Sequence, residues 1–121
     1  MRNNIDTSVG RTYEMNLNPG PFESIKIGRK SVEMRLNDER RQGIRRGDFI
    51  CFTHTVTNEK MTVRVEDVFT YPSFFELYEN HDKISIGYTE DEDADPSDML
   101  EYYPAQKIEK YGALAIVISL I

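Results

Sequence analysis

Three charged residues lie within six positions of one another and have the side chains of a binding site. The segment GRKSVEMR, residues 28–35, contains Lys30, Glu33 and Arg35. A lysine and an arginine close together can hold a phosphate group or donate to the carbonyl of a nucleic-acid base. The Glu33 carboxylate can accept a hydrogen bond from an exocyclic amine, or it can simply orient the two cations. This spacing indicates a polar site for an anionic or base-like ligand.

The alternation of residue types places these side chains on a strand. Apolar and polar residues alternate in SVEMRL, residues 31–36, as is typical of a half-buried strand. Residues two apart on a strand point to the same side, about 7 Å apart, so Glu33 and Arg35 project together. We expect this pair to point away from the core-facing residues Val32, Met34 and Leu36. The alternative interpretation is an exposed ion pair, which contributes little to stability.

Positive charge is concentrated around this strand although the chain is acidic. The 121 residues carry a formal net charge of −6 at pH 7. Residues 26–46 contain eight Lys and Arg against three acids, whereas residues 76–98 contain nine acids and one lysine. An acidic total disfavours indiscriminate binding to nucleic acid, but a local basic patch can still act there. Four arginines are candidate contacts to an RNA backbone, with a solvated loop as the alternative: Arg40, Arg41, Arg45 and Arg46.

The elements around the charged strand follow from patterning and turn residues. Strands are predicted at 13–17, 31–36, 49–54, 61–69 and 114–120. Helices are predicted from Pro21 to Gly28, from Ser73 to about Asn80, from Pro96 to Tyr103 and from Pro104 to Gly112. The resulting order of strand, helix, three strands, helices and strand predicts an α+β domain on a small antiparallel or mixed barrel. We assign residues 1–12 to an N-terminal extension and residues 13–121 to the domain.

Several function classes lack their signatures in this sequence. His54 and His81 stand alone, without other ligands at metal-binding spacing, so we expect no metal. The alternating aspartates of residues 91–95 begin like a calcium loop, but Pro96 stands where that loop needs glycine. Phosphate-binding glycine loops and dinucleotide fingerprints are missing, so we expect no cofactor. The apolar run at 113–121 is too short to cross a bilayer as a helix, and a chain with one cysteine and no signal-peptide pattern is expected in the cytoplasm, away from membranes.

Aromatic residues provide further candidates for contact with bases. Tyr102 and Tyr103, beside Pro104, are suited to stacking. Four more aromatic residues lie at helical spacing, which is more typical of a core than of a stacking surface: Tyr71, Phe74, Phe75 and Tyr78.

The segment GRKSVEMR also matches the pattern Gly-x-Lys-x-x-Glu-x-Arg, with Gly28, Lys30, Glu33 and Arg35 in the four fixed positions. This pattern resembles the motif of the ASCH (activating signal cointegrator homology) domains, a branch of the PUA-like superfamily. The resemblance implies a PUA-like small β-barrel with flanking short helices. It also implies a cleft that binds RNA or a nucleotide-like ligand, with Lys30, Glu33 and Arg35 in contact with that ligand and Gly28 shaping the backbone.

The order of the elements extends this resemblance over nearly the whole chain, from about Tyr13 to Ile121. A helix precedes the motif, a Gly-Asp turn lies at 47–48, and a Tyr-Gly pair at 111–112 precedes the β-rich end. The partner that the resemblance implies is RNA or a nucleoside or nucleotide; a protein partner is unknown.

Two alternative functions stay open. One branch of the family is an amidohydrolase that acts on acetylated cytidine. The resemblance places its lysine on Lys30, but Glu33 occupies the place of its threonine and has no hydroxyl proton to give up. A small amidohydrolase for a modified nucleoside would instead need Lys30 and Glu33 to activate water. The other alternative is a protein-interaction module that uses the acidic segment at 90–95.

Overall fold

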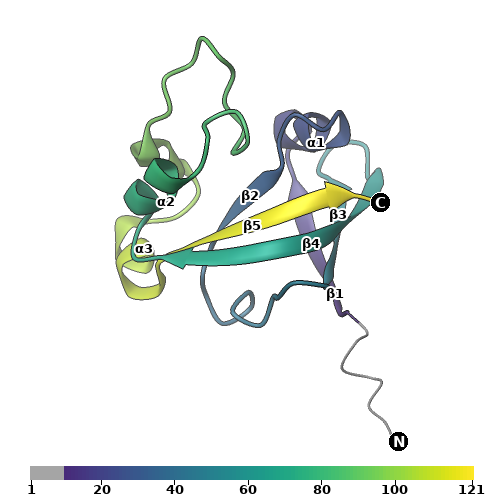
Figure 1. The fold of residues 1–121 in the computed structure, drawn as a ribbon, viewed down its shortest axis with the longest axis horizontal. Coiled ribbons are helices and arrows are strands. Elements are labelled where there is room, and N and C mark those ends of the chain that lie inside the picture. The colour runs from purple at the N-terminus through teal and green to yellow at the C-terminus, as the bar shows by residue number, and fades with distance from the viewer. Residues whose placement is uncertain (1–9) are drawn as a thin grey trace, which may run out of the picture.

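The computed structural model describes residues 10–121 (Figure 1). The predicted order of elements is confirmed, although the first helix begins at Pro19 rather than Pro21. Most of the predicted extension, residues 1–12, lies outside the described residues, and the first strand begins at Thr12. No helix within residues 10–121 is long and apolar enough to span a membrane. The elements are β1 (Thr12–Leu17), α1 (Pro19–Lys26), β2 (Val32–Leu36), β3 (Phe49–His54), β4 (Lys60–Tyr71), α2 (Phe74–Asn80), the 3₁₀ helix η2 (Pro96–Glu101), α3 (Ala105–Tyr111) and β5 (Ala113–Leu120).

The five strands form one sheet in the order β1-β3-β4-β5-β2. β1 runs parallel to β3, and every other neighbouring pair is antiparallel. A shift of register in β4, between Val65 and Asp67, lets this long strand bend. The sheet curls into a half-barrel with short helices beside it (Figure 1). The fold is α+β and fits a PUA-like barrel, with β1 and β2 as its two edges.

Both faces of this sheet are buried, so the charged pair of β2 points toward a core and not toward solvent. Glu33 lies opposite Ile116 and Arg35 opposite Leu114, and cross-strand partners share a face. That face carries the main core, which consists of Met15, Leu17, Phe22, Ile25, Ile44, Ile50, Phe52, Val63, Val65, Leu114, Ile116 and Ile118. The opposite face carries a second cluster under α2 and η2, which consists of Val32, Phe74, Leu77, Ile86, Met99, Ala113 and Ala115. The expectation that the charged pair points away from the core is therefore wrong, because alternation cannot show which face is polar when both are covered.

Two turns fix the start of β2. Gly28 has a φ of +83°, a left-handed conformation that glycine adopts readily, and it ends α1 as predicted. The amides of Arg29 and Lys30 then both donate to the carbonyl of Ser24, at 3.0 Å each. On the other side, the amides of residues 31 and 32 both donate to the Ser85 carbonyl, at 2.9 Å each. The start of β2 is thus held between α1 and the segment that follows α2.

Candidate functional site

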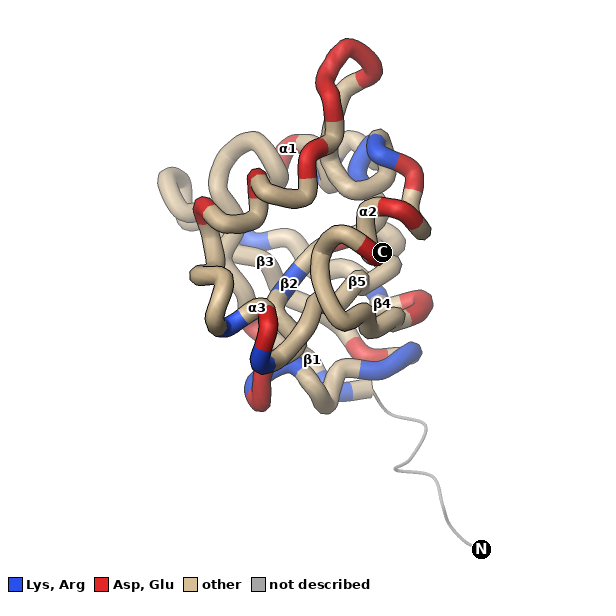
Figure 2. The backbone as a smooth tube through the Cα atoms, turned by 90° about the vertical axis from the view of Figure 1, so that its left-hand side faces the viewer, with Lys and Arg blue, Asp and Glu red and all other residues tan. Residues whose placement is uncertain are grey.

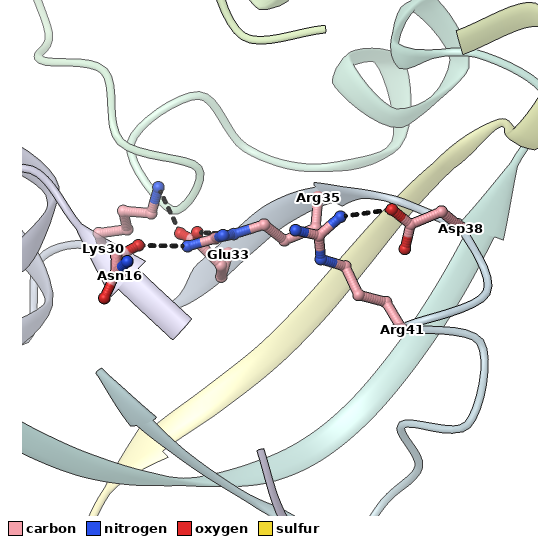
Figure 3. Close-up of polar contacts among 6 residues, drawn as sticks. All are labelled: Asn16, Lys30, Glu33, Arg35, Asp38 and Arg41. Atoms are coloured by element: carbon pink, nitrogen blue, oxygen red, sulfur yellow. Dashed lines mark hydrogen bonds and ion pairs between the residues drawn. The ribbon is translucent and has the colours of Figure 1, made fainter. Parts of the chain in front are cut away.

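Lys30, Glu33 and Arg35 form one buried ion network, which we call the floor triad (Figure 3). The Lys30 Nζ lies 3.0 Å from Glu33 Oε1, and Arg35 Nε donates to Glu33 Oε2 at 2.6 Å. The side chains of these residues are 8%, 5% and 14% exposed, in that order. The alternative interpretation of Glu33 and Arg35 as an exposed ion pair is therefore wrong.

Arg35 also connects the two edges of the half-barrel. Its Nη2 donates to the carbonyl of Asn16 at 2.8 Å, and Asn16 belongs to β1 (Figure 3). β1 and β2 do not pair with each other as strands. The planar guanidinium has donors in several directions, so one side chain can hold Glu33 and the facing strand at the same time.

A cleft opens where Arg35 joins β1 to β2. Its volume of about 530 Å³ is within the usual range for small-molecule sites. One wall comes from β1, α1 and β2, and includes Asn16, Ser24 and the floor triad. The other wall comes from α2 and the chain between Ile86 and Tyr103. Thr55, after β3, completes the lining on the first side, and its amide donates to the Leu17 carbonyl at 2.9 Å. All three charged residues of the motif therefore meet in one cleft.

One oxygen of the floor triad has capacity for a ligand. Glu33 Oε1 is buried and has no hydrogen-bond partner within residues 10–121. The Lys30 ammonium is close to it, but the contact is an ion pair whose geometry is not that of a hydrogen bond. A carboxylate oxygen has two lone pairs and the ammonium can occupy only one of them, so Oε1 can still accept a hydrogen bond from a ligand N–H.

The floor triad keeps Glu33 ionised. Burial raises the pKa of Glu33, but the Lys30 and Arg35 cations in contact with its two oxygens together lower it by more. The pKa therefore lies below its ordinary value. For Arg35, burial lowers the pKa and the Glu33 carboxylate raises it by more, so the guanidinium stays charged. At neutral pH the triad holds two cations and one anion.

Hydroxyl groups line the opposite wall. Tyr88 donates to Asp98 Oδ2 at 2.7 Å, and the hydroxyls of Tyr78 and Tyr88 are 2.9 Å apart, so Tyr78 donates to Tyr88. Burial raises the pKa of Tyr88, and its hydrogen bonds with Tyr78 and Asp98 raise it further. The Tyr88 hydroxyl therefore stays protonated, and the hydrogen bonds run in one direction, from Tyr78 to Tyr88 to Asp98.

The aromatic candidates separate into two groups. Tyr78, Tyr102 and Tyr103 line the cleft, whereas Tyr71, Phe74 and Phe75 do not. Tyr103 stacks on the buried Phe74, with ring centroids 6.1 Å apart and planes at 2°. Tyr102 is 60% exposed, which leaves its ring open to a ligand.

The four candidate arginines lie away from this cleft, on the loop of residues 37–48, which we call the arginine loop. Arg41 forms an ion pair with Asp38 at 2.9 Å (Figure 3), and Arg40, Arg45 and Arg46 are exposed. None of them lines the cleft. Two other residues fix the loop. Ile44 packs in the main core, and Asp48 accepts hydrogen bonds from the amides of Arg11 and Arg45. Contact of these arginines with RNA stays a prediction.

Sequence patterns missed several residues of the cleft. Gly87 has a φ of +120°, and a Cβ added there would lie 3.4 Å from Lys30 Cδ. Tyr88 follows it, and both lie between the helices predicted at 73–80 and 96–103, where no helix or strand is predicted. Gly28 lines a smaller hollow of about 130 Å³ behind Lys30 rather than the cleft itself. Among residues 10–121, no group of three or more His, Cys, Asp or Glu is placed to hold a metal ion.

Comparison with known proteins agrees with the geometry of the fold. The family model of the ASCH domain matches residues 15–121. The crystal structure of the hypothetical protein PH0355 shares 30% identity and a TM-score of 0.77, over 91% of this chain and 99% of that one. The solution structure of protein PF0455 from Pyrococcus furiosus shares 31% identity and a TM-score of 0.71, over 91% and 97%.

A more distant structure shares the fold. The crystal structure of a ZmASCH S128A mutant protein from Zymomonas mobilis has a TM-score of 0.67 at 14% identity, over 90% of this chain and 68% of that one. No curated protein matches the sequence. The family model covers nearly the whole described chain, including all of the motif, and this chain belongs to the ASCH domain family.

Proposed function

We propose that this protein binds a single nucleobase, presented by a nucleoside or by RNA, in the cleft above the floor triad. ASCH domains as a family are generally related to RNA binding, which sets the class of ligand. The observation that carries the proposal is the buried Glu33 Oε1, which has accepting capacity left for a ligand and lies 3.0 Å from the Lys30 ammonium. Together they offer an acceptor next to a donor.

This pair fits the edge of a base. The heterocyclic bases carry an N–H group next to a carbonyl or a ring nitrogen. Glu33 Oε1 would accept from the N–H group, and Lys30 would donate to its neighbour. Tyr102 and Tyr103 offer ring faces on which a base can stack. The ionised Glu33 also explains why the carboxylate serves as an acceptor rather than a donor.

Glu33 suits recognition better than hydrolysis. Its pKa is lowered by two adjacent cations, so the carboxylate is a weak proton acceptor. Attack by water on an acetylated base would need a stronger base at this position. The amidohydrolase alternative is therefore retained as one outcome of the test below.

Proton NMR with saturation transfer tests the proposal on cytidine, uridine, adenosine, guanosine and acetylated cytidine. We expect signal transfer to at least one nucleoside, and loss of that transfer in Glu33→Gln, whose amide cannot replace an ionised acceptor between two cations. Arg45→Ala, on the arginine loop, is the matched control and should bind as the wild type does. Transfer that survives in Glu33→Gln would contradict the proposed site, as would silence across the panel. A growing acetate signal that Lys30→Ala abolishes would favour the amidohydrolase instead.

A further inference from the structure

The mouth of the cleft carries a charge opposite to that of its floor. Three exposed carboxylates line it, which we call the mouth carboxylates: Glu92, Asp98 and Glu101. They come from η2 and from the acidic segment at 90–95, which we call the acidic loop and which projects from the body of the fold (Figures 1 and 2). The floor triad, in contrast, holds two cations and one anion and is almost fully buried.

The mouth carboxylates are held in place by specific contacts. Lys83 Nζ donates to the carbonyls of residues 90 and 92, at 2.8 and 2.6 Å, and so closes the base of the acidic loop. The amide of Thr89 donates to one oxygen of Glu92 at 2.7 Å, and Tyr88 donates to one oxygen of Asp98. Lys83 offsets part of the negative charge, but none of the three carboxylates forms an ion pair with a cation of residues 10–121.

A nucleoside in this cleft would have one orientation. The floor triad supplies the contacts for the edge of the base, so the base would enter first and the ribose would remain at the mouth. The substituent at the 5′ carbon would then lie among the three carboxylates. Charges closer together than the Debye length, about 8 Å at physiological salt, act on one another with little screening. A phosphate at this position would be repelled and an ammonium attracted.

We propose that the cleft selects nucleosides that carry a positive charge on the ribose side and rejects those that carry a 5′-phosphate. This inference rests on the proposed function, since it requires a base at the floor. Of the two forms in which that base could be presented, it favours a free nucleoside over a residue within RNA, which carries a phosphate at its 5′ carbon. The selection comes from the mouth carboxylates and not from the floor triad. The exposed ring of Tyr102 supports it, because an aromatic face attracts a cation.

Matched probes separate charge from base recognition. They are 5′-amino-5′-deoxyuridine, uridine and uridine 5′-monophosphate, together with the three corresponding compounds of cytidine, adenosine and guanosine. Within a series the base is constant, and the 5′ group changes from cationic to neutral to anionic. Calorimetry at low salt should give the tightest dissociation constant for the amine and the weakest for the phosphate, about ten-fold or more apart. The difference should shrink in high salt.

Substitution of the mouth carboxylates shows whether they cause the ranking of affinities by the charge of the 5′ group. The triple variant Glu92→Gln, Asp98→Asn, Glu101→Gln should bring amine and phosphate to nearly equal affinity while the neutral nucleoside still binds. Glu109→Gln, an exposed residue of α3 that does not line the cleft, is the control and should leave the ranking unchanged.

The two proposals fail in different ways. Phosphate that binds as tightly as the amine in the wild type, with binding still lost in Glu33→Gln, would overturn the charge selection alone. A ranking that persists in the triple variant would also overturn it. If no compound of the four series binds and acetylated cytidine is silent as well, the proposed function and this inference both fall.

Discussion

The floor triad and the arginine loop come from one continuous basic stretch, yet the fold treats them in opposite ways. Lys30 and Arg35 are buried, paired with one carboxylate and directed to the cleft. Residues 40–46 are held by Ile44 and Asp48, and most of their arginines are exposed. Charge density along a sequence therefore does not locate a site. Burial and the remaining hydrogen-bonding capacity of each group do so.

The largest expected difference between the two regions is in stability. Glu33→Ala leaves two buried cations without their anion and should lower the free energy of unfolding by about 3–5 kcal/mol. Arg45→Ala, exposed on the arginine loop, should change it by no more than about 0.5 kcal/mol. Urea denaturation followed by circular dichroism measures both. Equal effects for the two variants would contradict the contrast drawn here.

Two glycine substitutions, Gly87→Ala at the wall of the cleft and Gly20→Ala away from it, should differ in their effect on stability. Gly87→Ala forces a side chain onto a φ of +120° next to Lys30 and should cost about 1–3 kcal/mol of stability. It should also weaken nucleoside binding, because relief of the strained φ moves the backbone that packs against the Lys30 side chain. Gly20→Ala is the control: it lies in α1 with no atom within 4 Å of the added Cβ and should be neutral or stabilising. Thermal melts of both variants measure these effects, and an unchanged melting temperature for Gly87→Ala would contradict the left-handed backbone at residue 87.

The pH dependence of stability gives a smaller effect with a definite sign. The pKa of Glu33 is lower in the folded chain than its ordinary value of 4.5. The carboxylate thus contributes stability above that value, and this contribution is lost as the pH falls through the folded pKa. Each unit of lowering is worth about 1.4 kcal/mol.

Glu33→Gln isolates this contribution from those of the other carboxylates. Urea denaturation between about pH 5 and pH 3 should show a steeper loss of stability in the wild type than in the variant. Parallel curves would mean that Glu33 has the same pKa in the folded and unfolded chains.

The sequence was sufficient for the order of elements and for the shared face of Glu33 and Arg35. Both depend on local periodicity, which the chain shows directly. Which face was polar could not be predicted, because both sides of β2 are covered and Val32 and Met34 pack in the second cluster. The contact of Arg35 with Asn16 depends on how far the sheet curls, which no local pattern encodes.

The opposite wall of the cleft could not be predicted from the sequence for a different reason. Tyr88 and Gly87 lie in a segment without periodicity, and their positions follow from the Ser85 carbonyl that binds β2. Arg35 and the exposed Arg40 are the same residue type at similar local charge density. Local charge does not distinguish them: the motif resemblance singled out Arg35, and the tertiary structure shows that two of the six basic candidates line the cleft.

The most direct test of the account is to map nucleoside binding on the amide spectrum of the ¹⁵N-labelled protein. A titration with the nucleoside that shows saturation transfer should shift the amides of Lys30, Glu33, Gly87 and Tyr88 and leave residues 40–46 unchanged. Shifts confined to the arginine loop, with the floor triad unaffected, would contradict the central claim that the cleft above Lys30, Glu33 and Arg35 is the binding site.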